Sequence, residues 1–191
     1  MMIISSRISS AASLRHFRLL KAQVKRSKGY VELGCGNGEF ALKLAERIGT
    51  WILGIDKDAP AMPPDNFIHP SSSRFFFLQR PYTSINAKWA EFDWLKGSAE
   101  KIFMIMPYNK QDVGEEAELI RRIITPGGEL HIRTEEVNVF PKIRHFLARP
   151  LSEIPFYSAA LDITSEATQY VTKERNQGRG IPVYHLGLKF E

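Results

Sequence analysis

The sequence predicts an α/β fold: a mostly parallel seven-stranded sheet with helices on both faces and an antiparallel edge hairpin. Three observations support this prediction. Apolar, strand-like segments alternate with segments of helical periodicity. A glycine-rich turn directly follows the first strand-like segment. Two late strand-like segments have no convincing helix between them. Five strand–helix units followed by two strands are typical of a sheet covered on both faces.

The expected strands are short apolar runs, at residues 30–33, 51–55, 75–78, 102–106, 130–133, 157–163 and 183–190. Ala41, Leu44, Ala45 and Ile48 lie on one face of a first helix, which Gly49 should end. Further helices are expected around residues 86–96, 117–124 and 140–147, the second ending before a Pro-Gly-Gly sequence. Residues 58–73, rich in proline and serine, predict an irregular loop.

Length and composition limit the class of protein. A chain of 191 residues with 43% apolar and 25% charged residues predicts one globular domain and excludes a disordered or disulfide-stapled chain. The single cysteine, Cys35, cannot form an intramolecular disulfide, which fits a reducing compartment. No apolar run approaches the roughly 18 residues that a membrane span requires. We therefore expect a soluble, cytoplasmic protein that does not enter a membrane.

The N-terminus carries most of the positive charge. The net charge is +5, yet residues 1–30 contain seven Lys and Arg residues and no acid. We divide the chain into a basic arm or helix at 1–28 and a domain at 29–191. The arm has three interpretations: a contact for nucleic-acid phosphates, an organellar transit peptide, or a solvated amphipathic helix. The helical spacing of Phe17, Leu20 and Val24 supports the last.

The strongest local signal is the sequence around Gly34, Gly36 and Gly38. Glycines at alternate positions after a strand allow a sharp turn and a close approach of a ligand to the backbone, and the next helix offers its N-terminal amides. The spacing differs from that of dinucleotide-binding loops and favours a smaller adenosine ligand. Asp56 ends the second strand about 20 residues downstream, where a carboxylate can accept ribose hydroxyls. The structural alternative is a glycine-rich turn with a helix-capping acid.

Residues 32–38 resemble the first motif of class I S-adenosylmethionine-dependent methyltransferases. Residues 54–56 resemble their second motif, and residues 124–130 resemble the turn before their fifth strand. The resemblance implies a Rossmann-like fold and the cofactor S-adenosyl-L-methionine. It also implies cofactor-binding roles for seven residues: Glu32 (for the ammonium group), Gly34, Gly36, Gly38, Asp56, Asn86 and Pro107.

Within that superfamily the sequence is most similar to the bacterial tRNA (guanine-N7)-methyltransferases. Residues 36–40, 128–135 and 172–186 carry the similarity. After the fourth strand the chain departs from that family: Tyr108 replaces an aspartate, and acidic residues stand where the family has a basic cluster. These departures keep open a methyltransferase for rRNA, a protein or a small molecule, and a non-catalytic paralogue that binds the cofactor or RNA.

Methylation of guanine N7 needs no general base, because the cofactor is already activated and N7 has a free lone pair. Positioning is then the enzyme's main task. Tyr108 could stack on the target base, and Glu135 and Glu174 could hold a purine through its N–H donors. Thr134 and Thr172 could contact the methionine moiety. Each also has a plain structural alternative as an exposed or strand-end residue. The phosphate contacts would come from the arm, at Arg15, Arg18, Lys21, Lys25 and Arg26.

Other reactive residue types show no catalytic pattern. The five histidines lack metal-ligand spacing, so we expect no metal. Cys35 is interpreted as a small packed side chain, and residues 75–77 as strand core. The expected partner is RNA, most plausibly tRNA, bound by a monomer or a weak homodimer.

Overall fold

The structure is a computed structural model, and it describes residues 11–36, 38–58, 74–105, 113–134, 139–147, 151–153 and 184–191. The described helices are α1 (Ala11–Arg26), α2 (Glu39–Arg47), α3 (Tyr82–Ala87), α4 (Trp89–Phe92), η2 (Asp93–Leu95), α5 (Val113–Ile123) and α6 (Val139–Leu147). The described strands are β1 (Gly29–Leu33), β2 (Ile52–Asp56), β3 (Phe75–Gln79), β4 (Ala99–Ile105), β5 (Ile124–Thr134), β6 (Leu151–Glu153) and β7 (Tyr184–Phe190).

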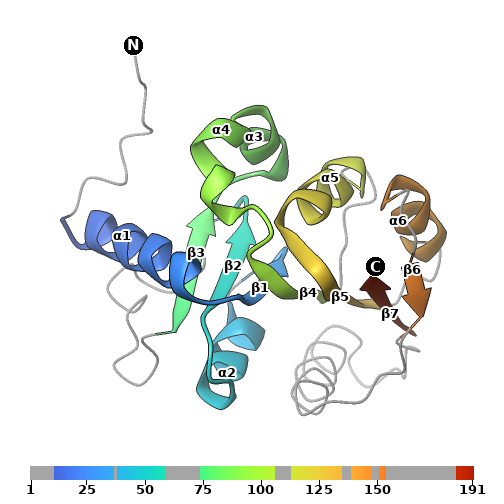
Figure 1. The fold of residues 1–191 in the computed structure, drawn as a ribbon, viewed down its shortest axis with the longest axis horizontal. Coiled ribbons are helices and arrows are strands. Elements are labelled where there is room, and N and C mark those ends of the chain that lie inside the picture. The colour runs from blue at the N-terminus through green and yellow to red at the C-terminus, as the bar shows by residue number, and fades with distance from the viewer. Residues whose placement is uncertain are drawn as a thin grey trace, which may run out of the picture.

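The described strands form one sheet in the order β3-β2-β1-β4-β5-β7-β6 (Figure 1). The pairs among β1 to β5 are parallel, and β7 runs antiparallel to both β5 and β6. The predicted mostly parallel sheet with an antiparallel edge is therefore confirmed. The edge partner of β7 is β6, whereas the expected strand at 157–163 lies outside the described residues. The strand order reverses between β1 and β4, and such a switch point opens a crevice at the carboxyl ends of the strands.

Helices cover both faces of the sheet, as predicted. One face carries a large apolar core to which α1, α3, α4, α5 and α6 contribute. On the other face, Phe40 and Leu44 of α2 pack with Ile52, Phe75 and Phe103. The two sets alternate along each strand because successive side chains point to opposite faces. Phe75 and Phe76 are buried, as expected for strand core.

Some elements differ from the expectation in their boundaries. The helix expected at 86–96 is replaced by α3, α4 and η2, because the backbone leaves helical geometry at Lys88 (φ −110°, ψ 32°). Strand β5 begins at Ile124, directly after α5. Gly127 adopts φ 73° inside it, and the β4–β5 register shifts between Ala99 and Lys101. The Pro-Gly-Gly sequence thus forms an irregularity within the strand.

Helix α1 packs against the fold through one face. Leu20 is buried in the large core, and the Phe17 ring meets the Trp94 ring edge-on, with centroids 5.5 Å apart. The Lys21 ammonium lies 4.8 Å from the Phe17 centroid and 5.4 Å from that of Trp94. The indole N–H of Trp51 donates to the carbonyl of Ser27, just beyond the helix, at 3.0 Å. Residues 11–26 form a helix, and its apolar face is packed rather than solvated, so the third interpretation of the basic N-terminus needs this correction.

Candidate functional site

The loop between β1 and α2 has a backbone that glycine makes possible. Gly34, Gly36 and Gly38 adopt φ values of 70°, 53° and 75°, in the left-handed region that other residues enter only with strain. The Gly34 amide donates to the Ile55 carbonyl at 2.8 Å, and the Gly38 amide to the Cys35 carbonyl at 2.8 Å. We call residues 34–38 the glycine loop. Its position at the carboxyl ends of β1 and β2 matches the prediction.

The glycines of this region serve different purposes. An added Cβ at Gly36 would meet no atom of the described residues within 4 Å, so the backbone there borders space that they leave open. An added Cβ at Gly38 would lie 2.9 Å from Cζ of Phe75, and one at Gly54 would lie 2.7 Å from Sγ of Cys35. Gly38 and Gly54 therefore allow close packing, while Gly36 leaves room for a ligand.

Cys35 is buried inside the glycine loop, as predicted for a packed side chain. Burial strongly raises the pKa of its thiol, and the nearby carboxylates of Glu32 and Asp56 raise it further. The thiol stays protonated at neutral pH, so it is not a nucleophile.

Asp56 is directed toward the glycine loop. Its Oδ2 accepts the amide of Gly36 at 2.8 Å, and its Oδ1 accepts the amide of Asp58 at 3.0 Å. The side chain therefore fixes the loop at the end of β2. Each carboxylate oxygen has a second lone pair, so Asp56 retains the capacity to accept hydroxyl donors from a ligand.

Glu32 is not the surface acid that its strand-end position allows. It is only 3% exposed. The backbone of Ala41, in the first turn of α2, hydrogen-bonds to its carboxylate. Gly38 offers no side-chain cap to that helix, so Glu32 satisfies one of the free amides instead. Burial raises the pKa of Glu32 well above its usual value, and Asp56 adds to this effect. Its Oε2 is buried without a hydrogen-bond partner among the described residues.

Two further polar residues, Tyr82 and Glu116, were not predicted as site residues, and the first of them lies near the glycine loop. The Tyr82 hydroxyl, at the start of α3, lies 3.4 Å from the position of a Cβ added at Gly34. Burial raises the pKa of Tyr82, and the carboxylates of Glu116, Asp56 and Glu32 raise it further. Glu116, in the first turn of α5, is only 6% exposed. A sequence signal for Glu116 exists, because it shares helical spacing with Val113, Ala117 and Ile120 on the buried face.

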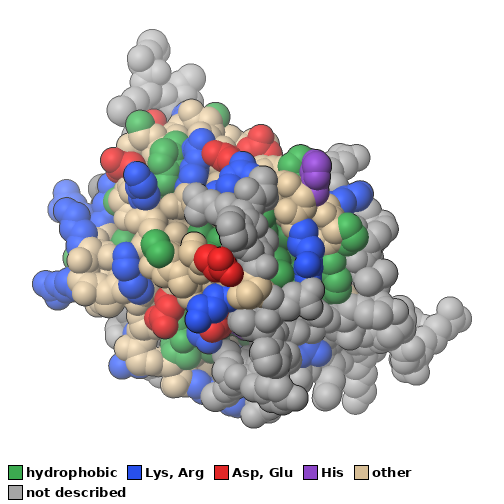
Figure 2. All heavy atoms as spheres, turned by 45° about the vertical axis from the view of Figure 1, so that its right-hand side comes forward, with side chains coloured by type: hydrophobic (Ala, Val, Ile, Leu, Met, Phe, Trp, Pro, Cys, Tyr) green, Lys and Arg blue, Asp and Glu red, His purple; other side chains and the backbone are tan. Residues whose placement is uncertain are grey.

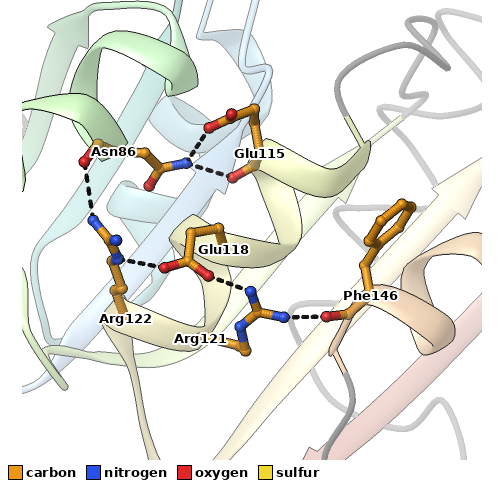
Figure 3. A network of polar contacts seen from close by, with 6 residues as sticks. All are labelled: Asn86, Glu115, Glu118, Arg121, Arg122 and Phe146. Atoms are coloured by element: carbon orange, nitrogen blue, oxygen red, sulfur yellow. Dashed lines mark hydrogen bonds and ion pairs between the residues drawn. The ribbon is translucent and has the colours of Figure 1, made fainter.

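Asn86 lies on α3, and its side chain contacts α5 (Figure 3). Its Nδ2 donates to the backbone carbonyl of Glu115 at 2.9 Å and to Oε2 of Glu115 at 2.7 Å. The backbone carbonyl of Asn86 accepts a hydrogen bond from Nη1 of Arg122 at 3.1 Å. The carboxylate of Glu118 accepts hydrogen bonds from both Arg121 and Arg122. Arg121 also donates to the backbone carbonyl of Phe146 on α6. These contacts give Asn86 a role in packing α3 against α5, and its contact with a cofactor stays a prediction.

The predicted substrate residues are only partly described. Thr134 is buried at the carboxyl end of β5. Arg18, Lys25 and Arg26 are exposed on α1, whereas Lys21 packs on aromatic rings. Figure 2 shows Lys and Arg side chains standing out on the side where Figure 1 places α1. Six predicted residues lie outside the described residues or have side chains that do: Arg15 (side chain only), Pro107, Tyr108, Glu135, Thr172 and Glu174.

The basic helix and the glycine loop lie toward opposite ends of β1. Helix α1 ends just before β1 begins, and the glycine loop follows where β1 ends. Five residues of strand separate the two by about 16 Å along the sheet. Lys25 and Arg26 therefore cannot line the glycine loop itself, and any contact with a shared ligand requires a large one.

No group of three or more His, Cys, Asp or Glu side chains within the described ranges could hold a metal ion. None of the helices in that part of the chain combines the length and the apolar character that a membrane crossing needs.

No protein-family model and no curated protein matches this sequence. Solved structures do match it over most of its length. The aminoglycoside resistance methyltransferase NpmB1 is similar with a TM-score of 0.61 and 19% identity, over 90% of this chain and 92% of that one. The W203A mutant of a 16S rRNA (adenine(1408)-N(1))-methyltransferase from Catenulisporales acidiphilia, with cosubstrate SAM, is similar with a TM-score of 0.56 and 19% identity. That match covers 92% of this chain and 91% of the other.

The chain has the Rossmann-like fold of the class I methyltransferases. That fold is not tied to one reaction, since the [4+2]-cyclase SpnF is also similar, with a TM-score of 0.54 and 14% identity, over 94% of this chain and 81% of that one. The function must therefore be argued from the site.

Proposed function

We propose that this protein is an S-adenosyl-L-methionine-dependent methyltransferase that acts on RNA. The observation that carries the proposal is the pairing of Asp56 with the glycine loop, where its carboxylate holds the Gly36 amide at 2.8 Å. Beside that contact the backbone of Gly36 borders open space. The proposal puts the adenosine against this backbone and its ribose on Asp56, beside the switch point between β1 and β4, where such folds bind ligands.

The donor set suits this cofactor. Asp56 would accept the ribose hydroxyls, and the glycine loop would approach the ligand through backbone atoms. Glu32 has a buried Oε2 without a partner among the described residues, and a bound ammonium group would favour the ionised carboxylate and donate to it. When bound, S-adenosyl-L-methionine supplies a methyl group that its sulfonium already activates.

The described residues position groups rather than transfer protons. The raised pKa values of Cys35 and Tyr82 keep both side chains protonated at neutral pH, so neither is a general base. An aromatic nitrogen with a free lone pair needs no base, and holding it in line with the methyl group is sufficient chemistry. Such an acceptor agrees with a site that has no activated nucleophile among its described residues.

Guanine N7 of tRNA is the acceptor that we propose first, on the resemblance of residues 36–40, 128–135 and 172–186. Tyr108, Glu135, Glu174 and Thr172 would then surround the base. A purine of rRNA is the second candidate, because the similar structures include a methyltransferase named for adenine N1 of 16S rRNA. The exposed Arg18, Lys25 and Arg26 of α1 would contact phosphates of either RNA at a distance from the methylated base.

Methyl transfer from labelled S-adenosyl-L-methionine tests the proposal. The full chain is incubated with tRNA and with ribosomal subunits from strains that lack the corresponding modifications, and the labelled nucleoside is identified after digestion. Label in 7-methylguanosine of tRNA supports the first acceptor, and label in rRNA supports the second. A protein that binds the cofactor but labels neither RNA is not the proposed RNA methyltransferase.

The role of α1 is tested separately by replacing Arg18, Lys25 and Arg26 with alanine. Loss of up to three phosphate contacts should reduce the slope of log affinity against log salt by about 0.7–0.9 for each contact. Cofactor affinity should not change, because α1 is remote from the glycine loop. An unchanged slope would assign these charges to solvation alone.

A further inference from the structure

Tyr82 brings a side-chain hydroxyl to the start of the glycine loop. It is the first residue of α3, which stands beyond the carboxyl ends of β2 and β3 in Figure 1. Its ring packs against the large core, and the residue is partly exposed. Its hydroxyl oxygen lies 3.4 Å from the position of a Cβ added at Gly34, and none of the described residues forms a hydrogen bond with it. The packed ring therefore holds an available hydroxyl at the edge of the proposed cofactor site.

The described amides of the glycine loop already donate within the protein. They are the amides of Gly34, Cys35, Gly36 and Gly38. Two of them donate to the Ile55 carbonyl, at 2.8 and 3.4 Å, one to Oδ2 of Asp56 at 2.8 Å, and one to the Cys35 carbonyl at 2.8 Å. An anionic group of a ligand beside this part of the loop therefore has to find its hydrogen-bond donor in a side chain.

The charged groups that act on Tyr82 are acids. Among the described groups that shift the pKa of Tyr82 or of Glu32, none is a cation. The amino-acid end of S-adenosyl-L-methionine carries an ammonium and a carboxylate on the same carbon. If Glu32 binds the ammonium, the ligand's carboxylate lies close to an acid of like charge, and a neutral donor offsets that repulsion. The raised pKa of Tyr82 keeps its hydroxyl protonated at neutral pH, so it can donate.

We propose that the Tyr82 hydroxyl donates a hydrogen bond to the carboxylate of bound S-adenosyl-L-methionine, and that the site thereby selects ligands that carry this carboxylate. The inference rests on the proposed function and deepens it. Asp56 would bind the cofactor at its ribose, and Glu32 and Tyr82 would bind it at its amino-acid end. Contacts on both sides of the sulfonium fix the position of the methyl group between them, which is the main task of such an enzyme.

Isothermal titration calorimetry with three ligands tests the proposal. S-adenosyl-L-methionine and S-adenosyl-L-homocysteine both carry the carboxylate, whereas decarboxylated S-adenosyl-L-methionine lacks it and keeps the ammonium and the sulfonium. Tyr82→Phe, which removes only the hydroxyl, should weaken binding of the two carboxylate-bearing ligands by about tenfold. Binding of the decarboxylated ligand should change by less than about twofold. The matched control is Tyr30→Phe, near the opposite end of β1 from the glycine loop, which should change none of the three affinities.

A rival donor for the carboxylate is Arg80, the cation closest to Tyr82 along the chain. Its Nη1 donates to the Gln79 carbonyl at 3.3 Å. A loss confined to the carboxylate-bearing ligands in Arg80→Gln, with none in Tyr82→Phe, would assign the carboxylate to Arg80 and overturn the proposal. Equal losses for all three ligands in Tyr82→Phe would also overturn it, because the hydroxyl would then act on another part of the cofactor or on the loop. No loss for any ligand in that variant would overturn it too.

Thermal unfolding verifies that each variant is folded. Tyr82→Phe keeps the ring that packs on the core; if it does not fold, Tyr82→Leu keeps an apolar side chain there and must show the same selective loss. A wild-type protein that binds none of the three ligands refutes the proposed function itself. Failure of this inference is a different result, in which the wild type binds the cofactor and Tyr82→Phe shows no selectivity for the carboxylate.

Discussion

Around β1, β2 and α2, two carboxylates are bound to backbone amides, whereas around α3, α5 and α6 side chains are bound to one another as well as to backbone carbonyls. Asp56 and Glu32 hold amides of the glycine loop and of the first turn of α2. In the second region, Glu118 is bound by both Arg121 and Arg122, and Asn86 joins Arg122 to Glu115. Each region has a buried oxygen without a partner among the described residues, Oε2 of Glu32 in the first and Oδ1 of Asn86 in the second. The first region also has open backbone at Gly36, and the second uses its polar groups to join helices (Figure 3).

This difference suggests which region can lose a side chain without losing function. A contact between a carboxylate and a loop amide fixes the shape of a ligand site, so its removal affects binding first. A contact between exposed side chains on helices fixes packing that apolar residues already hold.

The largest effect is expected from Asp56→Ala. The substitution removes the acceptor of the Gly36 and Asp58 amides and the proposed ribose contact. Affinity for S-adenosyl-L-homocysteine should fall by about 100-fold or more, since two charge-assisted hydrogen bonds of roughly 1.5–3 kcal/mol each are involved. Calorimetry measures the loss. Asp93→Ala, an exposed acid on η2, serves as the control and should keep wild-type affinity.

Gly36→Ala should weaken cofactor binding by about tenfold or more while the protein still folds. The added Cβ meets no atom of the described part of the chain and would enter the space that we propose for the ligand, and the left-handed backbone adds about 1–2 kcal/mol of strain. Gly49→Ala is the matched control, because Gly49 also has free space but no positive φ. Thermal unfolding and calorimetry on both variants distinguish the two sites. Equal affinities would place the ligand away from Gly36.

Glu32→Gln should stabilise the protein increasingly as pH rises. The pKa of Glu32 is raised above 4.5, so the folded state keeps a proton that the unfolded state releases. The protonated Glu32 therefore contributes to the stability of the wild type in full below about pH 4.5. This contribution is lost as the pH rises through the folded pKa of Glu32. The variant has no such loss. The free energy of unfolding of Glu32→Gln, relative to that of the wild type, should therefore grow with pH by up to about 1.4 kcal/mol for each unit of pKa shift.

Urea unfolding at about pH 5 and about pH 8 measures that difference. The same variant should bind S-adenosyl-L-methionine more weakly, since the acceptor for the ammonium group is weaker. A stability difference that is constant with pH would show that Glu32 titrates alike in the folded and unfolded states.

The smallest effect is expected from Glu118→Ala, in the side-chain network of α5. Its partners Arg121 and Arg122 are each 29% exposed, so solvent screens both ion pairs. The free energy of unfolding should fall by about 0.5–1 kcal/mol, and cofactor affinity should be unchanged. A large loss of affinity would show that the α5 network supports the ligand site after all.

The sequence predicted the region of backbone contacts better than the region of side-chain contacts, for a physical reason. Positive φ at Gly36 and Gly38 requires glycine, so the loop is visible in the residue types. Asp56 follows from its register at the end of β2. The burial of Glu32 and Glu116 depends on how α2 and α5 pack, which no local pattern fixes. The break in helix geometry at Lys88 occurs at an ordinary residue and leaves no signal.

The tertiary position of Tyr82 was also beyond the sequence. Its neighbours in the chain include Pro81 but no motif, and its hydroxyl reaches Gly34 only because α3 starts beside the end of β2. The predicted Asn86, one turn later on α3, occupies the contact with α5 instead. A prediction based on spacing along the chain cannot separate two positions on the same short helix.

The central claim is that the glycine loop and Asp56 form the binding site of S-adenosyl-L-methionine. Amide chemical shifts, followed in ¹⁵N spectra during titration with S-adenosyl-L-homocysteine, test it most directly. We predict saturable shifts that are largest at the Gly34, Cys35 and Gly36 amides and that disappear in Asp56→Ala. Saturable shifts centred on another part of the chain, or none at all in the folded wild type, would contradict the claim.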